Sequence, residues 1–287
     1  MNSENQSSSD NFPSNPKHTL LKLLLDKKNI SFNAQPIPRQ DEKSPIPLSF
    51  AQERLWFFNQ LEGASATYNM PAAIRITGKL NTTAFQQALA EIVRRHQILH
   101  TSFQTVEDGP IQFINPNATI EIQITDLQHQ DTTESEATIH QLAKQEALTP
   151  FDLKTAPLIR CSLLQLSPTE HVVLLTMHHI VSDAWSIGVL IQELSVLYPA
   201  FVAGLASPLP ELPIQYADFA VWQRKYLSGE FLDNQLNYWH SQLQGAPDLL
   251  QLPTDRSRPS IQTYQGKTQS FTLSSRLNQQ QIGRAHV

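Results

Sequence analysis

The stretch of sequence that decides the fold spans residues 158–184 and reads LIRCSLLQLSPTEHVVLLTMHHIVSDA. Two β-rich runs, Leu158–Leu166 and His171–Met177, flank the turn residues Ser167–Glu170. Runs of branched and apolar residues on either side of a proline-containing turn are typical of a β-hairpin. The second run is apolar at successive positions, which predicts a buried strand. This strand leads directly into two histidines and, shortly after them, an aspartate.

The two histidines are His178 and His179, and adjacent residues of a regular strand point to opposite faces. We therefore expect one imidazole to point into the body of the protein and the other into a cleft. A neutral imidazole with a pKa of about 6.5 accepts a proton at neutral pH, so the histidine in the cleft is a candidate general base. Asp183 lies in the expected strand-to-helix turn, where it could orient the imidazole or pair with a distant arginine.

Three other interpretations compete for this cluster. A histidine beside an apolar strand is commonly a core residue with satisfied hydrogen bonds. A zinc site is disfavoured, because the pair lacks the i, i+4 spacing of a helical zinc motif and its side chains diverge. A serine hydrolase is disfavoured as well, because no G-x-S-x-G is present and Ser182 lacks the small flanking residues of a nucleophile elbow.

Outward from this stretch, apolar periodicity predicts the remaining elements. Predicted helices span Ser49–Leu61, Asn81–His96, Thr133–Leu148, Trp185–Gly204, Ile214–Leu227 and Phe231–Leu243. Predicted strands span Ala72–Ile76, Thr101–Phe103, Ile111–Ile114 and Thr268–Leu273, and the middle two flank an Asp-Gly hairpin turn. The mixture indicates an α/β or α+β fold with a mixed sheet.

Local signals mark several of these helices. Ser49 is a predicted N-cap with Gln52 at the capping-box spacing, and Asn81 is a second predicted N-cap. Pro199 should kink the helix Trp185–Gly204 or end it early. The predicted inward-facing residues are Phe85, Leu89, Ile92, Val93 and His96 in one helix, Ile139, Leu142 and Ala143 in the next, and Ile187, Leu190, Ile191, Leu194, Leu197 and Phe201 in the third.

Composition excludes several classes of function. The chain has 287 residues, of which 40% are hydrophobic and 16% charged, which suits a packed core. A net charge of -5 and a pI near 6.0 argue against nucleic-acid or anionic-membrane surfaces. The single cysteine, Cys161, permits no internal disulfide and no cysteine-based zinc site, and it fits a cytoplasmic location. No Gly-rich phosphate loop, signal peptide or membrane span is found.

Residues 1–47 form a separate region before the folded body. Residues 1–16 are polar and predicted to be disordered, and His18–Asn29 is a predicted short amphipathic helix. Gln35–Pro47 carries four prolines and reads as an extended linker. The body is then expected to begin at about Leu48.

Residues 178–184 resemble the HHxxxDG core motif of condensation domains from nonribosomal peptide synthetases, with Ala184 in place of the glycine. One such motif is shared by several acyltransferase families, so the resemblance rests on three further segments in the family's order. Residues 49–57 (SFAQERLWF), 95–103 (RHQILHTSF) and 216–223 (YADFAVWQ) resemble the motifs SxAQxRLW, RHExLRTxF and YxDFAxWQ.

Within the second of these segments, Gln97 and His100 replace the family's Glu and Arg. Heterocyclising relatives replace the histidine pair with DxxxxD, which is absent here. Epimerisation domains open with a different first motif, so residues 49–57 favour condensation. The stereochemical subtype, the donor and acceptor substrates and the peptide product stay open.

The resemblance implies an α/β fold, specifically an α+β two-layer sandwich, with two halves that are each similar to chloramphenicol acetyltransferase and meet at a V-shaped cleft. Donor and acceptor peptidyl carrier proteins from adjacent synthetase modules dock at opposite faces. They deliver substrates on 4'-phosphopantetheine arms, so no directly bound cofactor and no metal are expected. The implied reaction is amide formation, in which the acceptor amine attacks the donor thioester.

The family's roles carry over onto five residues of this chain. His179 is expected to contact the attacking amine, as a base or by positioning it, and His178 to pack inward. Asp183 corresponds to an aspartate that pairs with an arginine and holds the loop. Arg54 is a candidate for supporting that loop, or else a surface or helix-packing residue. Ala184 is expected to reduce turnover without abolishing it, with strain only if its φ is positive.

The resemblance also divides the chain. Residues 48–252 are expected to form a complete N-terminal subdomain, and residues 253–281 the crossover and start of a truncated second subdomain. Residues 282–287 (IGRAHV) match a back-translated sequencing adapter and are suspected not to be biological. The segment 17–30 is a candidate docking element for an upstream synthetase. Two alternatives remain: a non-catalytic carrier-binding module and a free-standing acyl-CoA acyltransferase.

Overall fold

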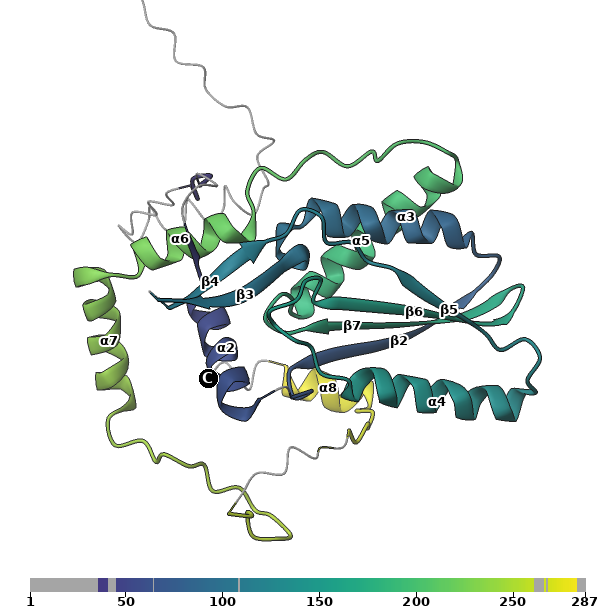
Figure 1. The fold of residues 1–287 in the computed structure, drawn as a ribbon. Helices are drawn as coiled ribbons and strands as arrows, with labels where there is room; N and C mark the ends of the chain where they lie inside the picture. Colours follow the sequence, from purple (N-terminus) through teal and green to yellow (C-terminus); the bar gives the residue numbers. More distant parts are fainter. Residues whose placement is uncertain are drawn as a thin grey trace, which may run out of the picture.

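The computed structural model describes residues 36–40, 45–63, 65–107, 109–260, 266 and 268–282. The predicted disordered stretch 1–16 and the predicted helix His18–Asn29 lie outside these residues. Figure 1 shows helices packed around a central sheet, and the predicted α/β class is confirmed.

The central sheet has four strands in the order β2-β7-β6-β5. These strands are β2 (Asn69–Thr77), β7 (Glu170–His178), β6 (Ile159–Ser167) and β5 (Ile122–Asp126). The predicted hairpin is confirmed, because β6 and β7 pair antiparallel around the turn. Strand β5 runs parallel to β6, so the sheet is mixed as predicted.

Strand β7 is apolar at successive positions because both faces of the sheet are covered. Its odd-numbered side chains, such as Val173 and Leu175, pack into the main core with α3 (Thr82–Arg95) and α5 (Ala184–Val202). Its even-numbered side chains, Val172 and Leu174, pack against α4 (Thr132–Leu148) on the other face. The fold therefore has a helix layer on each face of the sheet, one layer more than the predicted two-layer sandwich.

A smaller sheet has the strand order β1-β4-β3. It contains β1 (Ile46–Pro47), β4 (Gly109–Ile114) and β3 (Thr101–Val106), and the 3-10 helix η1 (Gln97–His100) leads into it. The prediction that Gln35–Pro47 is an extended linker is therefore wrong for its last two residues, which form strand β1 and pair with β4. Proline is tolerated at such an edge position, where no ladder hydrogen bond is required of its nitrogen.

The local helix signals are confirmed. Helix α2 (Phe50–Glu62) begins with the predicted capping box between Ser49 and Gln52. Helix α3 begins at the predicted N-cap Asn81 and buries the four predicted apolar residues, while His96 ends it as the C-cap. The two later helices also form, as α6 (Tyr216–Tyr226) and α7 (Gly229–Leu243).

Helix α5 differs from its prediction at one inward-facing position. Ile191 is 52% exposed, because it lies beside the stripe formed by Leu190, Leu194 and Leu197. The helix contains Pro199 and ends at Val202, before the predicted end at Gly204, as expected for a helix that a proline ends early. Helix α5 is long and apolar enough to cross a membrane. This is weak evidence for a membrane span, because α5 packs against α3 in the fold.

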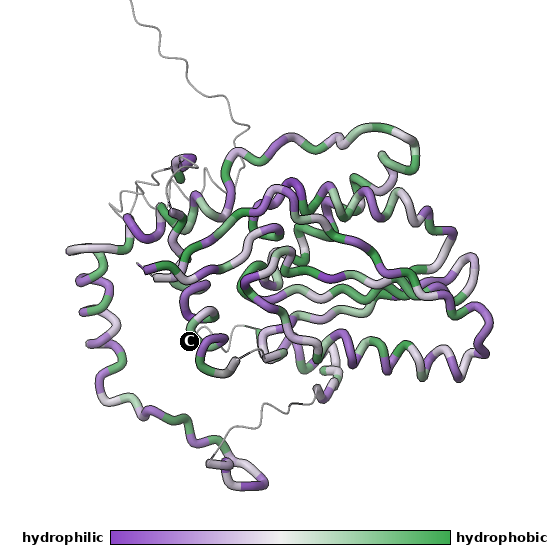
Figure 2. The backbone as a smooth tube through the Cα atoms, viewed as in Figure 1, coloured by the Kyte–Doolittle hydropathy of each residue, from purple (hydrophilic) through white to green (hydrophobic). Residues whose placement is uncertain are grey.

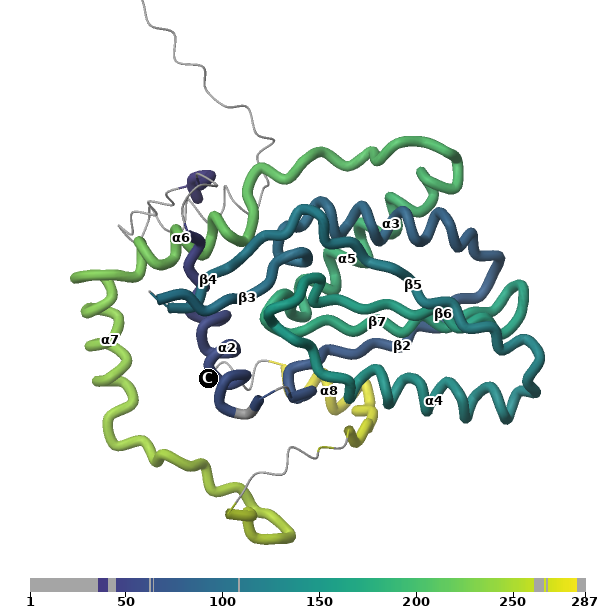
Figure 3. Tube along the Cα trace, viewed as in Figure 1, coloured from purple at the N-terminus to yellow at the C-terminus, as the bar shows by residue number. Residues whose placement is uncertain are grey.

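The C-terminal part departs most from expectation. The predicted strand Thr268–Leu273 is absent, and helix α8 (Ser275–Gln281) follows an irregular stretch. A strand needs a neighbour for its backbone hydrogen bonds, and the described part of the chain supplies none here. Figure 3 shows α8, in yellow, lying below β2. Figure 2 shows polar and apolar residues alternating along α7, and none of the residues of α7 is buried.

Candidate active site

The two histidines take opposite positions, as predicted. His178, the last residue of β7, is 1% exposed, and the rings of Tyr68 and Phe151 lie near its imidazole. Its Nδ1 accepts a hydrogen bond from the backbone N–H of Ile180 at 3.1 Å. Burial lowers the pKa of His178 to about 4, with a smaller contribution from neighbouring His179. His178 is therefore neutral at physiological pH and belongs to the core.

His179 is exposed and lines a cavity. Its Nδ1 lies 2.7 Å from the carbonyl oxygen of Ser182. A carbonyl only accepts, so Nδ1 carries the proton and donates, and Nε2 keeps a free lone pair. The loop therefore fixes the tautomer in which Nε2 is an acceptor. Orientation of the imidazole was one of two roles considered for Asp183, and in the structure the Ser182 carbonyl takes that role.

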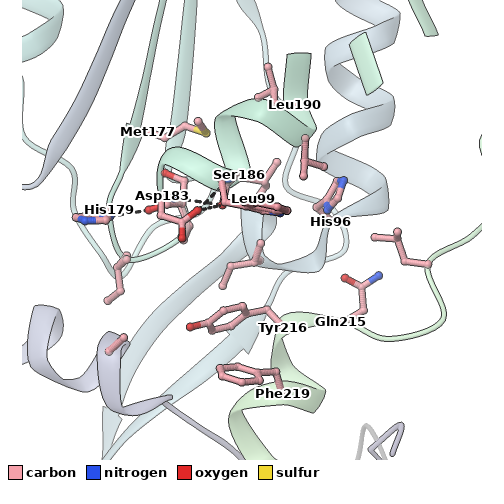
Figure 4. Close-up of a pocket in the computed structure, with 18 of the residues that line it drawn as sticks. His96, Leu99, Met177, His179, Asp183, Ser186, Leu190, Gln215, Tyr216 and Phe219 are labelled. Atoms are coloured by element: carbon pink, nitrogen blue, oxygen red, sulfur yellow. Dashed lines mark hydrogen bonds between the residues drawn. The ribbon is translucent and has the colours of Figure 1, made fainter. Parts of the chain in front are cut away.

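Asp183 acts as the N-cap of α5 (Figure 4). Its Oδ1 accepts hydrogen bonds from the backbone N–H and the hydroxyl of Ser186, at 2.9 and 2.7 Å. These two bonds hold the pKa of the Asp183 carboxyl below its ordinary value. Within the described part of the chain no arginine forms an ion pair with it, so the aspartate holds the loop by capping a helix.

Ala184 is the first helical residue of α5. Residues at this position have right-handed helical dihedrals, so φ is negative. An alanine in place of glycine then introduces no backbone strain, and the added methyl group is the whole difference.

The cavity beside His179 has a volume of about 550 Å³. Its walls are mainly apolar and come from α2, α3, η1, β7, α5 and α6. The polar side chains of Arg54, His96, Asp183, Gln215 and Tyr216 lie among its lining residues. Arg54 is thus brought to the same cavity as His179, as an exposed side chain that forms no ion pair within the described residues.

A buried ion pair fastens the cavity's walls together. Glu193 of α5 contacts the guanidinium of Arg95 at 3.3 Å and the Nε2 of His96 at 2.9 Å. Arg95 also donates to the carbonyl of Pro210 at 2.9 Å, in the long connection between α5 and α6. Figure 3 shows this connection passing over α3. The RHQILHTSF segment therefore supports the cavity's shape.

The other wall comes from the start of α6. The hydroxyl of Tyr216 lies 2.9 Å from the Oγ of Ser49, which joins the first and last of the quoted motifs. Gln215 donates its side-chain amide to the backbone of Arg95 at 2.9 Å. His96, Gln215 and Tyr216 were not predicted as site residues, although they lie in or next to the motif segments RHQILHTSF and YADFAVWQ. Only the fold brings them to His179.

The model of the family described as "Condensation domain" matches residues 42–286. The chain belongs to the condensation domain family. This condensation domain is 47% identical over 257 residues to a linear gramicidin synthase protein of Brevibacillus parabrevis, with 90% of the chain and 5% of that protein covered. It is 46% identical over 231 residues to malpinin synthetase of Mortierella alpina, with 80% of the chain and 3% of that protein covered.

Solved structures agree with the fold. The X-domain from teicoplanin biosynthesis is 29% identical with a TM-score of 0.68, and the match covers 79% of this chain and 49% of that one. The first condensation domain of the calcium-dependent antibiotic synthetase, in complex with a substrate analogue, is 24% identical with a TM-score of 0.64, over 72% and 49% of the two chains. This condensation domain therefore spans about half the length of its structural relatives.

Proposed function

We propose that this chain contributes the His179 side of an amide-forming site in nonribosomal peptide synthesis. The observation that carries the proposal is the imidazole of His179, whose Nε2 lone pair is free at an apolar cavity while Ser182 holds Nδ1. An N–H of an attacking amine is the natural partner of such a lone pair. The linear gramicidin synthase relative, at 47% identity, supports the reaction class.

The proposed reaction joins an acceptor amine to a donor thioester. A C–N bond forms as the C–S bond breaks, and the proton released by the amine ends on the departing thiolate. His179 accepts a hydrogen bond from the amine, and it either positions the nitrogen or takes its proton. Positioning alone supplies much of the acceleration, because it removes the entropy of bringing two reactants together.

Carrier proteins are the proposed source of both substrates, and their 4'-phosphopantetheine arms are the proposed cofactor. Membership of the condensation domain family and the 47% identity to a linear gramicidin synthase protein support this. We place the arms at the cavity's apolar walls beside His179. The chain's own residues bind and orient the arms, and the thioester itself supplies the activation.

We also propose that residues 48–252 form one half of the domain and residues 253–281 begin the other. Two observations support this division. The matches cover about half of each solved relative, 49% in both cases above. Helix α7 buries none of its residues, and Leu236, Trp239 and Leu243 are exposed along one stripe.

The test is amide formation from two loaded carrier proteins, one with an acyl group and one with an aminoacyl group, followed by mass spectrometry. We expect His179→Ala to lower the rate by about 100-fold, the scale of a lost general base or positioning group. His140→Ala, at an exposed histidine of α4, is the matched control and should keep the rate. Equal rates for the two variants would overturn the proposal.

A second candidate is a module that binds partners without catalysis. One observation favours it: the X-domain at 29% identity is described in a complex with OxyB. In the assay above this candidate predicts carrier binding with no His179-dependent product.

A further inference from the structure

The wall opposite α5 carries a hydroxyl that the proposed reaction has not used. Tyr216 and His179 line the same cavity, from different elements (Figure 4). The Tyr216 hydroxyl lies 2.9 Å from the Oγ of Ser49, and either oxygen is chemically able to donate. The direction of this one hydrogen bond decides what Tyr216 offers to the cavity.

The surroundings of Ser49 set that direction. Ser49 is 0% exposed, and its Oγ already accepts the backbone N–H of Gln52 at 3.2 Å as the N-cap of α2. Its own hydroxyl proton still needs an acceptor, because a buried donor left without one is destabilising. Among the described residues, the Tyr216 oxygen is the acceptor within reach. Ser49 therefore donates and Tyr216 accepts.

Tyr216 then has a hydroxyl proton of its own to place. In the described part of the chain its hydroxyl has no hydrogen-bond partner other than Ser49, so that proton is directed to the cavity. Burial raises the pKa of Tyr216, so the phenol keeps its proton at neutral pH. The cavity thus presents a donor at Tyr216 and an acceptor at the Nε2 of His179.

We infer that Tyr216 donates a hydrogen bond to the carbonyl oxygen of a pantetheine-bound acyl group in this cavity. The identity of the ligand rests on the proposed function. A carbonyl oxygen matches a phenol donor, and an amine N–H matches the acceptor on His179. Negative charge develops on that oxygen as the amine attacks, and a fixed donor aimed at it stabilises the transition state.

The test compares two ligands on two proteins. The ligands are octanoyl-pantetheine, a thioester, and the matching thioether with CH₂ in place of the carbonyl, because the apolar walls suit an alkyl chain. For the unaltered chain we expect the thioester to bind about 3- to 10-fold more tightly than the thioether, the range for one neutral hydrogen bond. Tyr216→Phe should bind both ligands alike.

Controls separate this contact from a general loss of structure. Tyr226→Phe changes a half-exposed tyrosine of the same helix outside the cavity and should keep the thioester preference. The double variant Ser49→Ala/Tyr216→Phe removes both hydroxyls of this pair, so no hydroxyl proton is left without an acceptor, and only the Gln52 N–H loses its cap. It should also bind both ligands alike.

Two results would overturn the assignment in distinguishable ways. If Tyr216→Phe or the double variant keeps the thioester preference, Tyr216 is not the donor and the proposed function stands. If the unaltered chain binds neither ligand, the proposed function fails and this assignment fails with it.

Discussion

His178 and His179 carry the same side chain in opposite environments, and the alternation of a β-strand is the cause. His178 faces the core, and its Nδ1 accepts a hydrogen bond from the backbone N–H of Ile180, so the imidazole stays neutral. His179 faces a cavity, and the Ser182 carbonyl leaves its Nε2 as a free acceptor. One residue thus secures the loop and the other is available for chemistry.

Acid should destabilise the protein through His178. Its pKa is about 4 when folded and about 6.5 when unfolded, so between these values only the unfolded chain takes up the proton. The free energy of unfolding is therefore highest above pH 6.5 and falls by roughly 3 kcal/mol as the pH drops towards 4. Urea unfolding at pH 7 and pH 4.5 measures this fall.

In His178→Gln this part of the fall should disappear, because glutamine does not titrate. His140→Gln changes an exposed histidine and should keep it. An unchanged pH dependence in His178→Gln would contradict the assignment of His178 as a buried neutral group.

Asp183 should stabilise the protein as a helix cap. Asp183→Ala is expected to lower the free energy of unfolding by about 1 kcal/mol, whereas Asp183→Asn should keep most of it, because asparagine caps equally well. Thermal unfolding of the three proteins distinguishes capping from an ion pair. If asparagine proves as damaging as alanine, the charge matters and a cationic partner is required.

At the scale of elements, two distant motifs meet where α2 begins. Gln223 of α6 accepts the backbone N–H of Phe50 at 3.0 Å. Arg224 donates to the carbonyl of Leu48 at 2.7 Å, pairs with Glu53 and lies over the Phe50 ring at 4.2 Å. The segment SFAQERLWF, the segment YADFAVWQ and Arg224, which directly follows it, therefore form one clamp, which sets the cavity wall that carries Tyr216.

Removal of the clamp's arginine should cost more than removal of its ion pair. Arg224→Ala loses a carbonyl contact, stacking and packing, so we expect about 1–2 kcal/mol of lost stability. Glu53→Gln removes only a partly exposed pair and should cost less than about 1 kcal/mol. Equal losses in urea unfolding would show that the ion pair alone holds the clamp.

Sequence signals were sufficient where they are local. The caps Ser49 and Asn81 were predictable because each binds a backbone N–H only three residues further along the chain. Ile191, by contrast, depends on how the helix is rotated against its neighbours, and the strand expected at Thr268–Leu273 depends on a distant partner. The opposite orientations of His178 and His179 were predicted from strand alternation, whereas Tyr216 reaches the site only through the tertiary fold.

At the scale of the whole molecule, four motifs spread over residues 49–223 converge on one cavity. The segment HHIVSDA supplies the acceptor Nε2 of His179 and the N-cap of α5. The segment RHQILHTSF supplies Arg95 and His96, which bind Glu193 of α5. The clamp then adds Tyr216 and Arg54 as part of the facing wall. The arrangement places an apolar chamber, a lone pair and a hydroxyl where a tethered acyl group is proposed to enter.

The most direct measurement asks whether a carrier-bound arm reaches His179. A carrier protein whose pantetheine arm ends in a chloroacetyl group would alkylate an accessible imidazole nitrogen, and peptide mass spectrometry would locate the label. Buried Cys161 does not compete, because burial raises the pKa of its thiol to about 12. We predict labelling of His179 at Nε2, well above that of exposed His140. Labelling of His140 and His179 to the same extent, or of neither, would contradict the proposed site.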